Sequence, residues 1–165
     1  MRKRGEKQSK KVTLFLSNIR SAHNAGAIMR TADAAGVSEV VFGGFTPGPE
    51  DRFGRVRTAF TKASLGAEKN VPWRVSNDSV KELSRMKKTG SYLIAVEQTQ
   101  DAVDYKKMKL PDKPTVIIMG NEVEGISSKV LRLVDTIVEI PMRGKKESLN
   151  VSVAAGIVLY RWFDC

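Results

Sequence analysis

Short apolar stretches alternate with helix-forming segments along this chain, and this alternation constrains the fold more than any other feature. It predicts βαβ units, in which helices join parallel strands and cover both faces of a sheet. Residues 115–119 are almost wholly apolar and run into Gly120, which indicates a central, doubly covered strand. We therefore expect an α/β fold with a mainly parallel sheet and helices on both faces. Strands are expected at 12–16, 37–42, 92–97, 115–119 and 136–140, with short extended pieces near Trp73 and at 103–105; helices are expected at 24–35, 58–69, 78–88, 128–134 and 149–163.

Capping residues indicate where several of these helices begin and end. Asn24 can accept backbone hydrogen bonds at the start of the first helix, and Gly36 is a typical C-terminal stop. The other expected boundaries are a cap at Asp78, an interruption at Gly66, and a cap at Ser148 or Asn150.

The last predicted helix is apolar on nearly all its faces. A helix of this kind must be buried. A domain of this size offers limited interior, so part of that burial is expected to come from a second subunit, and we predict a homodimer.

The net charge of +10, from 28 lysines and arginines against 18 acidic residues, indicates a polyanionic partner. Six cations surround one acid within residues 1–11, so we expect a flexible basic arm there and a single domain over residues 12–165. A merely solvated tail remains the alternative for the arm. Residues 46–57 are expected to form a mobile loop, whose Arg52, Arg55 and Arg57 are candidates for RNA contact.

The composition excludes several common classes of protein. Cys165 is the single cysteine, which rules out an internal disulfide and fits a reducing, cytoplasmic compartment. No apolar run is long enough to span a bilayer, and the basic N-terminus lacks the apolar core of a secretory signal. One histidine and one cysteine cannot form a zinc site of the usual ligands, and we expect no metal. The glycines fit neither a P-loop nor a dinucleotide-binding fingerprint.

Three loops rich in glycine and small polar residues follow predicted strands. In open α/β sheets, ligands bind beyond the carboxyl ends of strands. The first loop, residues 18–30, holds Asn24 and Arg30, and small residues beside Arg30 leave room for a substrate. The second, residues 119–125, places Glu122 in a tight turn between two glycines. The third, residues 140–150, leads into the last helix, whose N-terminus favours polar or negative groups. Taken singly, each loop can equally be an ordinary turn, cap or surface arginine.

Together, these three loops resemble the motifs of the SpoU–TrmH family of SPOUT-class RNA 2′-O-methyltransferases. The matching segments are 23–37, 118–125, 140–142 and 148–155, and residues 65–68 also look like a family segment. The resemblance extends from about Val12 to Phe163. It implies a C-terminal trefoil knot, a feature that is rare among folds. It also implies S-adenosylmethionine bound inside the knot and an obligate dimer with its active site at the subunit interface.

Carried over by motif position, the resemblance implies three sets of site residues. The catalytic set is Asn24, Arg30, Glu122, Ser148 and Asn150. The cofactor-binding set is Glu97, Met119, Gly120, Asn121, Gly125, Ile140, Met142, Ser148, Leu149 and Asn150. The RNA-binding set is Arg20, His23, Arg30, Arg52, Arg55 and Arg57; for His23 a structural role remains the alternative. Many relatives have an extra N-terminal RNA-binding domain, and some have a basic extension after the last helix. We expect neither here beyond the basic arm of residues 1–11, and this expectation leaves the RNA target open.

The implied reaction requires a ribose hydroxyl to lose its proton. Arginine keeps its proton in almost every protein setting, so Arg30 is a poor general base. We expect Arg30 to grip the adjacent RNA phosphate and stabilise the developing alkoxide; loss of the arginine proton on RNA binding is the alternative. Three other functions stay open at this point: an RNA-binding or assembly factor without methyl transfer, a base methyltransferase, and a small-molecule methyltransferase, which fits the charge poorly.

Overall fold

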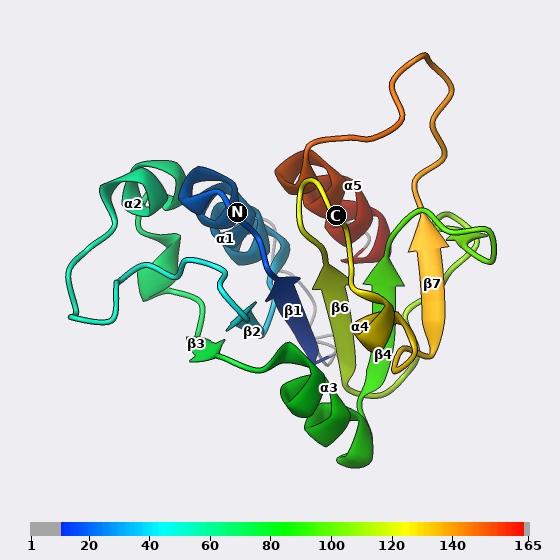
Figure 1. Cartoon of the computed structure of the whole chain (residues 1–165), viewed down its shortest axis with the longest axis horizontal. Coiled ribbons are helices and arrows are strands. Elements are labelled where there is room, and N and C mark those ends of the chain that lie inside the picture. Colours follow the sequence, from blue (N-terminus) through cyan, green and yellow to red (C-terminus); the bar gives the residue numbers. More distant parts are fainter. Residues whose placement is uncertain (1–10, 164–165) are drawn as a thin grey trace, which may run out of the picture.

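The computed structural model describes residues 11–163, and these form one parallel sheet covered by helices on both faces (Figure 1). The sheet has seven strands in the order β3-β2-β1-β6-β4-β7-β5, and every strand pairing in it is parallel. The strands are β1 (Val12–Ser17), β2 (Glu39–Gly43), β3 (Trp73–Ser76), β4 (Tyr92–Val96), β5 (Val103–Asp104), β6 (Thr115–Met119) and β7 (Thr136–Glu139). The helices are α1 (Ala22–Ala35), α2 (Thr58–Ser64), the 3₁₀ turn η1 (Ala67–Lys69), α3 (Ser79–Lys88), α4 (Ser128–Leu131) and α5 (Val151–Phe163).

Strand β6 lies at the centre of the sheet, as its apolar sequence predicts. It pairs with β1 on one side and β4 on the other, and all five of its residues are buried. Side chains alternate across a strand, so β6 contributes to two cores. Ile117 and Met119 pack on the side of α1, α2 and α5, and Val116 and Ile118 pack on the side of α3 and α4.

The predicted helix boundaries are largely confirmed, with one correction. Gly36 ends α1 in the left-handed conformation, Asp78 caps α3, and the 58–69 segment is interrupted at Leu65 and Gly66. The prediction that Asn24 caps the first helix is wrong. Ser21 is the N-cap of α1, and its Oγ accepts the Asn24 N–H at 3.1 Å. Asn24 therefore lies inside the first turn, and its side-chain amide is available for hydrogen bonds to other loops.

The connection between β2 and α2 is more regular than the expected mobile loop. Residues Glu50 and Val56 form an antiparallel bridge, which folds residues 50–56 into a hairpin. The rest of the predicted basic arm, residues 1–10, lies outside the described residues, as does Cys165. The trefoil knot stays a prediction, because the strand order does not by itself report how the chain is threaded. None of the helices within residues 11–163 has the length and hydropathy needed to cross a membrane.

Candidate active site

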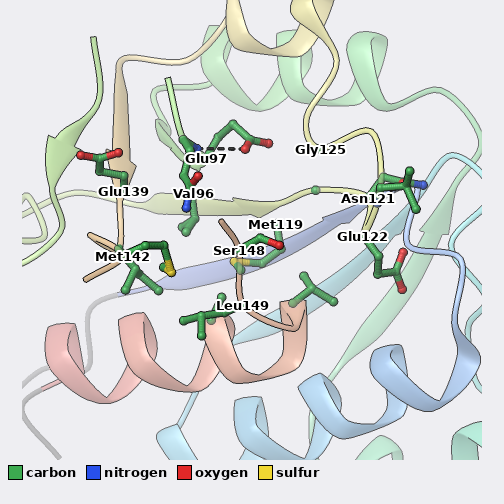
Figure 2. A pocket seen from close by; sticks show the side chains of 16 residues that line it. Val96, Glu97, Met119, Asn121, Glu122, Gly125, Glu139, Met142, Ser148 and Leu149 are labelled. Atoms are coloured by element: carbon green, nitrogen blue, oxygen red, sulfur yellow. Dashed lines mark hydrogen bonds between the residues drawn. The ribbon is translucent and has the colours of Figure 1, made fainter. Parts of the chain in front are cut away.

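A pocket opens at the carboxyl ends of β4, β6 and β7, where the first turn of α5 faces the sheet (Figure 2). Because the strands are parallel, the segments that follow them gather at this one edge of the sheet. The cavity measures about 200 Å³. It is lined by Val96, Glu97, Gln98, Met119, Gly120, Asn121, Glu122, Val123, Gly125, Glu139, Ile140, Met142, Ser148, Leu149, Val151 and Ala154.

The wall of the pocket combines apolar side chains with negative charge. Met119, Met142 and Leu149 lie around the cavity between sheet and helix (Figure 2). Three carboxylates, those of Glu97, Glu122 and Glu139, are among the lining groups, and none of the lining residues that the structure describes is lysine or arginine. In a protein of net charge +10, this is a local site for a ligand with an apolar body and positive charge.

The turn from Gly120 to Ile126 favours glycine at two positions, for different reasons. A Cβ on Gly120 would lie 2.6–2.7 Å from Ile126 and the Gly125 carbonyl carbon, so the two arms of the turn touch there. Gly125 has a φ of +67°, and a Cβ on it would meet the Glu97 carboxylate at 2.3 Å. A side chain at position 120 would force the two arms of the turn apart, whereas one at position 125 would displace the Glu97 carboxylate and strain the left-handed backbone.

Two polar side chains hold this turn in place. The amide oxygen of Asn121 accepts the N–H groups of Val123 and Glu124, while its Nδ2 donates to the Asn18 carbonyl at 2.7 Å. Glu97 accepts the N–H of Ile126 at 2.8 Å and that of Gln98 at 2.9 Å. Both residues thus shape the pocket through the backbone.

Glu122 joins the second loop to the first. Its Oε2 accepts the Arg20 N–H at 2.9 Å, and its Oε1 accepts the Ser21 N–H at 3.1 Å and the Asn24 side-chain amide at 3.0 Å. Partial burial alone would raise the pKa of Glu122, but these hydrogen bonds outweigh it and hold the pKa below its ordinary value of 4.5. The carboxylate is therefore kept ionised at the N-terminus of α1, where negative charge is favoured.

Asn24 extends the connection to the third loop. Its Oδ1 accepts the Asn150 side-chain amide at 3.2 Å, while Oδ1 of Asn150 accepts the Ser152 N–H at 2.8 Å. Asn150 thus caps α5 and bonds to Asn24, which decides between the two caps that the sequence left open. It is not among the pocket-lining residues, whereas the exposed Ser148 is. We call Glu122, Asn24 and Asn150 the bridging triad.

Arg30 lies apart from this pocket. It is exposed and lines a second hollow with His23, Ala27, Thr31 and Ala34 of α1, Lys62 and Ala63 of α2, and Tyr160 of α5. Successive helix residues turn by about 100°, so Arg30 projects about 120° around α1 from Asn24. Within one chain, the structure brings together four of the five predicted catalytic residues and leaves Arg30 on another face of α1.

The other predicted RNA-binding residues fall into two groups. Arg20 is exposed, and its backbone N–H donates to the carboxylate of Glu122, which lines the pocket. Arg52, Arg55 and Arg57 lie in or beside the 50–56 hairpin, where Arg55 pairs with Asp51 at 2.7 Å. Sequence reasoning missed the polar lining residues Gln98 and Glu139, and also Lys62 and Tyr160 beside Arg30. The apolar lining residues that it missed are Val96, Val123, Val151 and Ala154. Glu139 lies next to the end of the predicted strand 136–140, at the same edge of the sheet as Met119, which could have indicated it.

Comparison with known proteins gives consistent results for nearly the whole chain. The model of the SpoU rRNA Methylase family matches residues 11–160. A tRNA (guanosine(18)-2′-O)-methyltransferase of Aquifex aeolicus is 33% identical over 155 residues, covering 94% of this chain and 70% of that relative. The crystal structure of an A. aeolicus TrmH/SpoU tRNA modifying enzyme superposes with a TM-score of 0.80 at 31% identity, covering 94% of this chain and 75% of that one.

A further structure shows a similar fold with a ligand present. The AdoMet-bound rRNA methyltransferase from Sinorhizobium meliloti has a TM-score of 0.82 at 28% identity, covering 92% of this chain and 55% of that one. The chain spans only 59–62% of several other curated relatives, from staphylococci and Bacillus subtilis.

Proposed function

The chain belongs to the SpoU rRNA methylase family, and on that premise we propose that it transfers the methyl group of S-adenosylmethionine to a ribose 2′-hydroxyl of RNA. The observation that carries the proposal is the joining of three distant loops around one pocket by the bridging triad. A base methyltransferase and an RNA-binding factor without catalysis remain the alternatives that experiment must exclude.

The pocket fits the proposed cofactor in its chemistry. Apolar side chains such as Met119, Met142 and Leu149 suit the adenine ring, and the backbone of residues 119–125 offers groups for its polar edge. Glu97 and Glu139 are acidic, and their negative charge favours the positively charged sulfonium and ammonium groups of the cofactor. When bound, S-adenosylmethionine supplies an electrophilic methyl group on a positively charged sulfur.

The residues of this chain then have separable roles. The bridging triad fixes the three loops relative to one another, so Asn24, Glu122 and Asn150 act as positioning residues. Ser148 lines the pocket and helps to shape it. Arg30 is proposed to bind the phosphate next to the target ribose and to stabilise the oxygen as its proton leaves to phosphate or solvent. This role suits a guanidinium, which presents a fork of donors to phosphate.

We propose that the site is completed by a second copy of the chain, because Arg30 lies outside the pocket of its own chain. Helix α5 leaves apolar surface uncovered, with Val153 50% and Tyr160 43% exposed, and Tyr160 borders the Arg30 hollow. A homodimer formed through this region would cover these side chains and could bring Arg30 of one copy to the pocket of the other. The RNA substrate is tRNA or rRNA, and we propose a cytoplasmic location because a single cysteine suits a reducing compartment.

The activity is tested by incubating the protein with radiolabelled methyl donor and total RNA, then digesting the RNA and identifying the modified nucleoside by mass spectrometry. We expect a 2′-O-methylated nucleoside at a defined position. A methylated base would replace this proposal with a base methyltransferase. Labelling no greater than that of a Met119→Arg variant, together with RNA binding, would favour the non-catalytic factor.

The shared site is tested by complementation. An Arg30→Ala chain and a Glu122→Ala chain, each inactive alone, are unfolded together and refolded as a mixture. If the site spans two copies, each mixed dimer contains one composite site with no substitution, and about a quarter of the wild-type activity returns. If each site is built from one chain, every site carries a substitution and the mixture stays inactive.

A further inference from the structure

The hairpin of residues 50–56 holds an aromatic ring between two cations. The guanidinium carbon of Arg52 lies 4.7 Å from the centre of the Phe53 ring, and that of Arg55 lies 5.1 Å from it. Phe53 is nevertheless 66% exposed, one of the most exposed large apolar side chains among the described residues. An apolar ring left open to water at a hairpin tip contributes nothing to the core.

The tip is ordered by its own hydrogen bonds. Oδ1 of Asp51 accepts the N–H groups of Phe53 at 2.8 Å and Arg55 at 3.0 Å, and Oδ2 accepts Nε of Arg55 at 2.7 Å. Gly54 takes the left-handed conformation with a φ of +75°, and its N–H donates to the Asp51 carbonyl. The backbone that carries the ring is therefore fixed before any partner arrives, which lowers the entropy lost on binding.

The connection that carries the hairpin begins at the same edge of the sheet as the pocket. Strand β2 is parallel to β1 and β6, so its carboxyl end lies at the edge where the pocket opens. Thr46, at the start of the connection, accepts the Ile19 N–H at 3.0 Å and donates to the carbonyls of Leu16 and Gly43. The connection is thereby anchored to the loop that reaches Glu122. A nucleic acid strand at the pocket could extend toward the hairpin.

We propose that Phe53, flanked by Arg52 and Arg55, is a stacking platform for an unpaired base of the RNA, distinct from the nucleotide that is methylated. This inference rests on the proposed function for the identity of its partner. An aromatic face stacks on any base, and adjacent guanidiniums add cation–π attraction and phosphate contacts. Arg55 is tied to Asp51, whereas Arg52 makes no ion pair among the described residues, so Arg52 is the cation assigned to phosphate.

The test measures binding of two RNA probes without cofactor: a short hairpin RNA with an unpaired loop, and a fully paired RNA duplex. Phe53→Ala is expected to weaken binding of the hairpin RNA about ten-fold and to leave binding of the duplex unchanged, because only unpaired bases can stack. Phe53→Trp should retain tight binding, while Phe53→Leu should not, since it keeps the apolar volume and lacks the aromatic face. Arg52→Gln should lower the salt dependence of binding by about one counterion.

Phe45→Ala is the matched control, since it removes a ring of similar exposure, 61%, from the same β2–α2 connection. Equal losses for Phe45→Ala and Phe53→Ala would overturn the platform as a specific site, as would equal losses on both RNA probes. If Phe53→Ala leaves RNA binding unchanged but weakens self-association in sedimentation, the tip is a contact between copies of the chain, and the inference is wrong.

The readouts separate this inference from the proposed function. RNA binding is measured without methyl transfer, so the platform can be confirmed even if no methylated ribose is found. Conversely, a chain that methylates ribose normally while Phe53→Ala binds hairpin RNA as tightly as wild type would refute the platform alone. Calorimetric titration with S-adenosylmethionine should give the same affinity for wild type and Phe53→Ala, which checks that the pocket is intact.

Discussion

Helix α1 presents two regions that are held in opposite ways. At its N-terminal end, Glu122 and Asn150, distant in the sequence, bond to Asn24 and lock the helix to the pocket. Further along, Arg30 faces a solvent-exposed hollow with no comparable cross-link among the described residues. The N-terminal end of α1 is thus held by bonds to two other loops, whereas the Arg30 face is open to solvent. Under the proposed function, one chain can bind the cofactor and still need a second copy to supply Arg30.

Removing the Arg30 side chain should change only the exposed region of α1 and should have the largest effect on the rate of methyl transfer. Arg30→Ala is expected to lower kcat by about 10²–10³-fold, because a cation that stabilises developing charge is lost. Its midpoint of thermal unfolding and its affinity for S-adenosylmethionine should stay at wild-type values. Steady-state transfer of labelled methyl groups to RNA gives the rate. Arg132→Ala, at an exposed arginine beyond α4, is the control; a full rate for Arg30→Ala would remove Arg30 from the chemistry.

A methyl group added at Gly120, in the turn that lines the pocket, should instead disturb the region around the N-terminal end of α1 and the pocket. Gly120→Ala places a Cβ within 2.7 Å of the opposite arm of the turn, and we expect about 1–3 kcal/mol of lost stability together with weaker cofactor binding. Urea unfolding and calorimetry give the two quantities. Gly144→Ala is the matched control because a Cβ there would meet nothing within 4 Å. Equal stability of the two variants would contradict the tight crossing.

Neutralising Glu122 should lower the stability of the fold by an amount that depends on pH. Glu122→Gln is expected to cost about 1–2 kcal/mol at neutral pH, since the charged acceptor of three donors is replaced by a neutral amide. The folded state lowers the pKa of Glu122, so the stabilising contribution is present above the ordinary value of 4.5 and disappears as pH falls through the lower, folded-state pKa. The stability difference between wild type and Glu122→Gln should therefore shrink in acid. Glu124→Gln, at an exposed position two residues further along the same turn, is the control and should keep wild-type stability at neutral pH.

Two substitutions at Asn150 should separate the effects of its two hydrogen bonds, one to Asn24 and one to the Ser152 N–H. Asn150→Ala removes both the cap of α5 and the link to Asn24, at a cost of about 1 kcal/mol. Asn150→Asp keeps an acceptor for the Ser152 N–H but can no longer donate to Asn24. We expect Asn150→Asp to unfold like wild type and to bind S-adenosylmethionine more weakly. Full cofactor affinity in Asn150→Asp would show that the link to Asn24 is dispensable.

The sequence predicts most of the framework, because local patterns determine it. The limits of β6 follow from an apolar run that ends at Gly120, and the end of α1 follows from Gly36. The start of α1 does not follow in the same way, since serine and asparagine are both good caps and Ser21 takes the position that the sequence suggests for Asn24. The Asn24 side chain bonds to Glu122 instead, and no local pattern encodes that remote contact.

The position of Arg30 is also beyond local reasoning. The motif places Arg30 near Asn24 in sequence, which suggests a shared site, but the helical rotation separates their side chains. The hairpin around Phe53 was missed for a related reason: glycine, proline and mixed charge indicated a mobile loop, whereas Asp51 supplies enough acceptors to organise it.

The bonds of the bridging triad join residues separated by 98 and 126 positions, so none of them can form early in synthesis. A chain still emerging from the ribosome lacks the third loop until residue 150 is free, and loop-closure entropy delays such remote contacts even then. Cofactor binding should accordingly report on completed folding. Truncated or stalled chains would therefore be unable to bind the methyl donor.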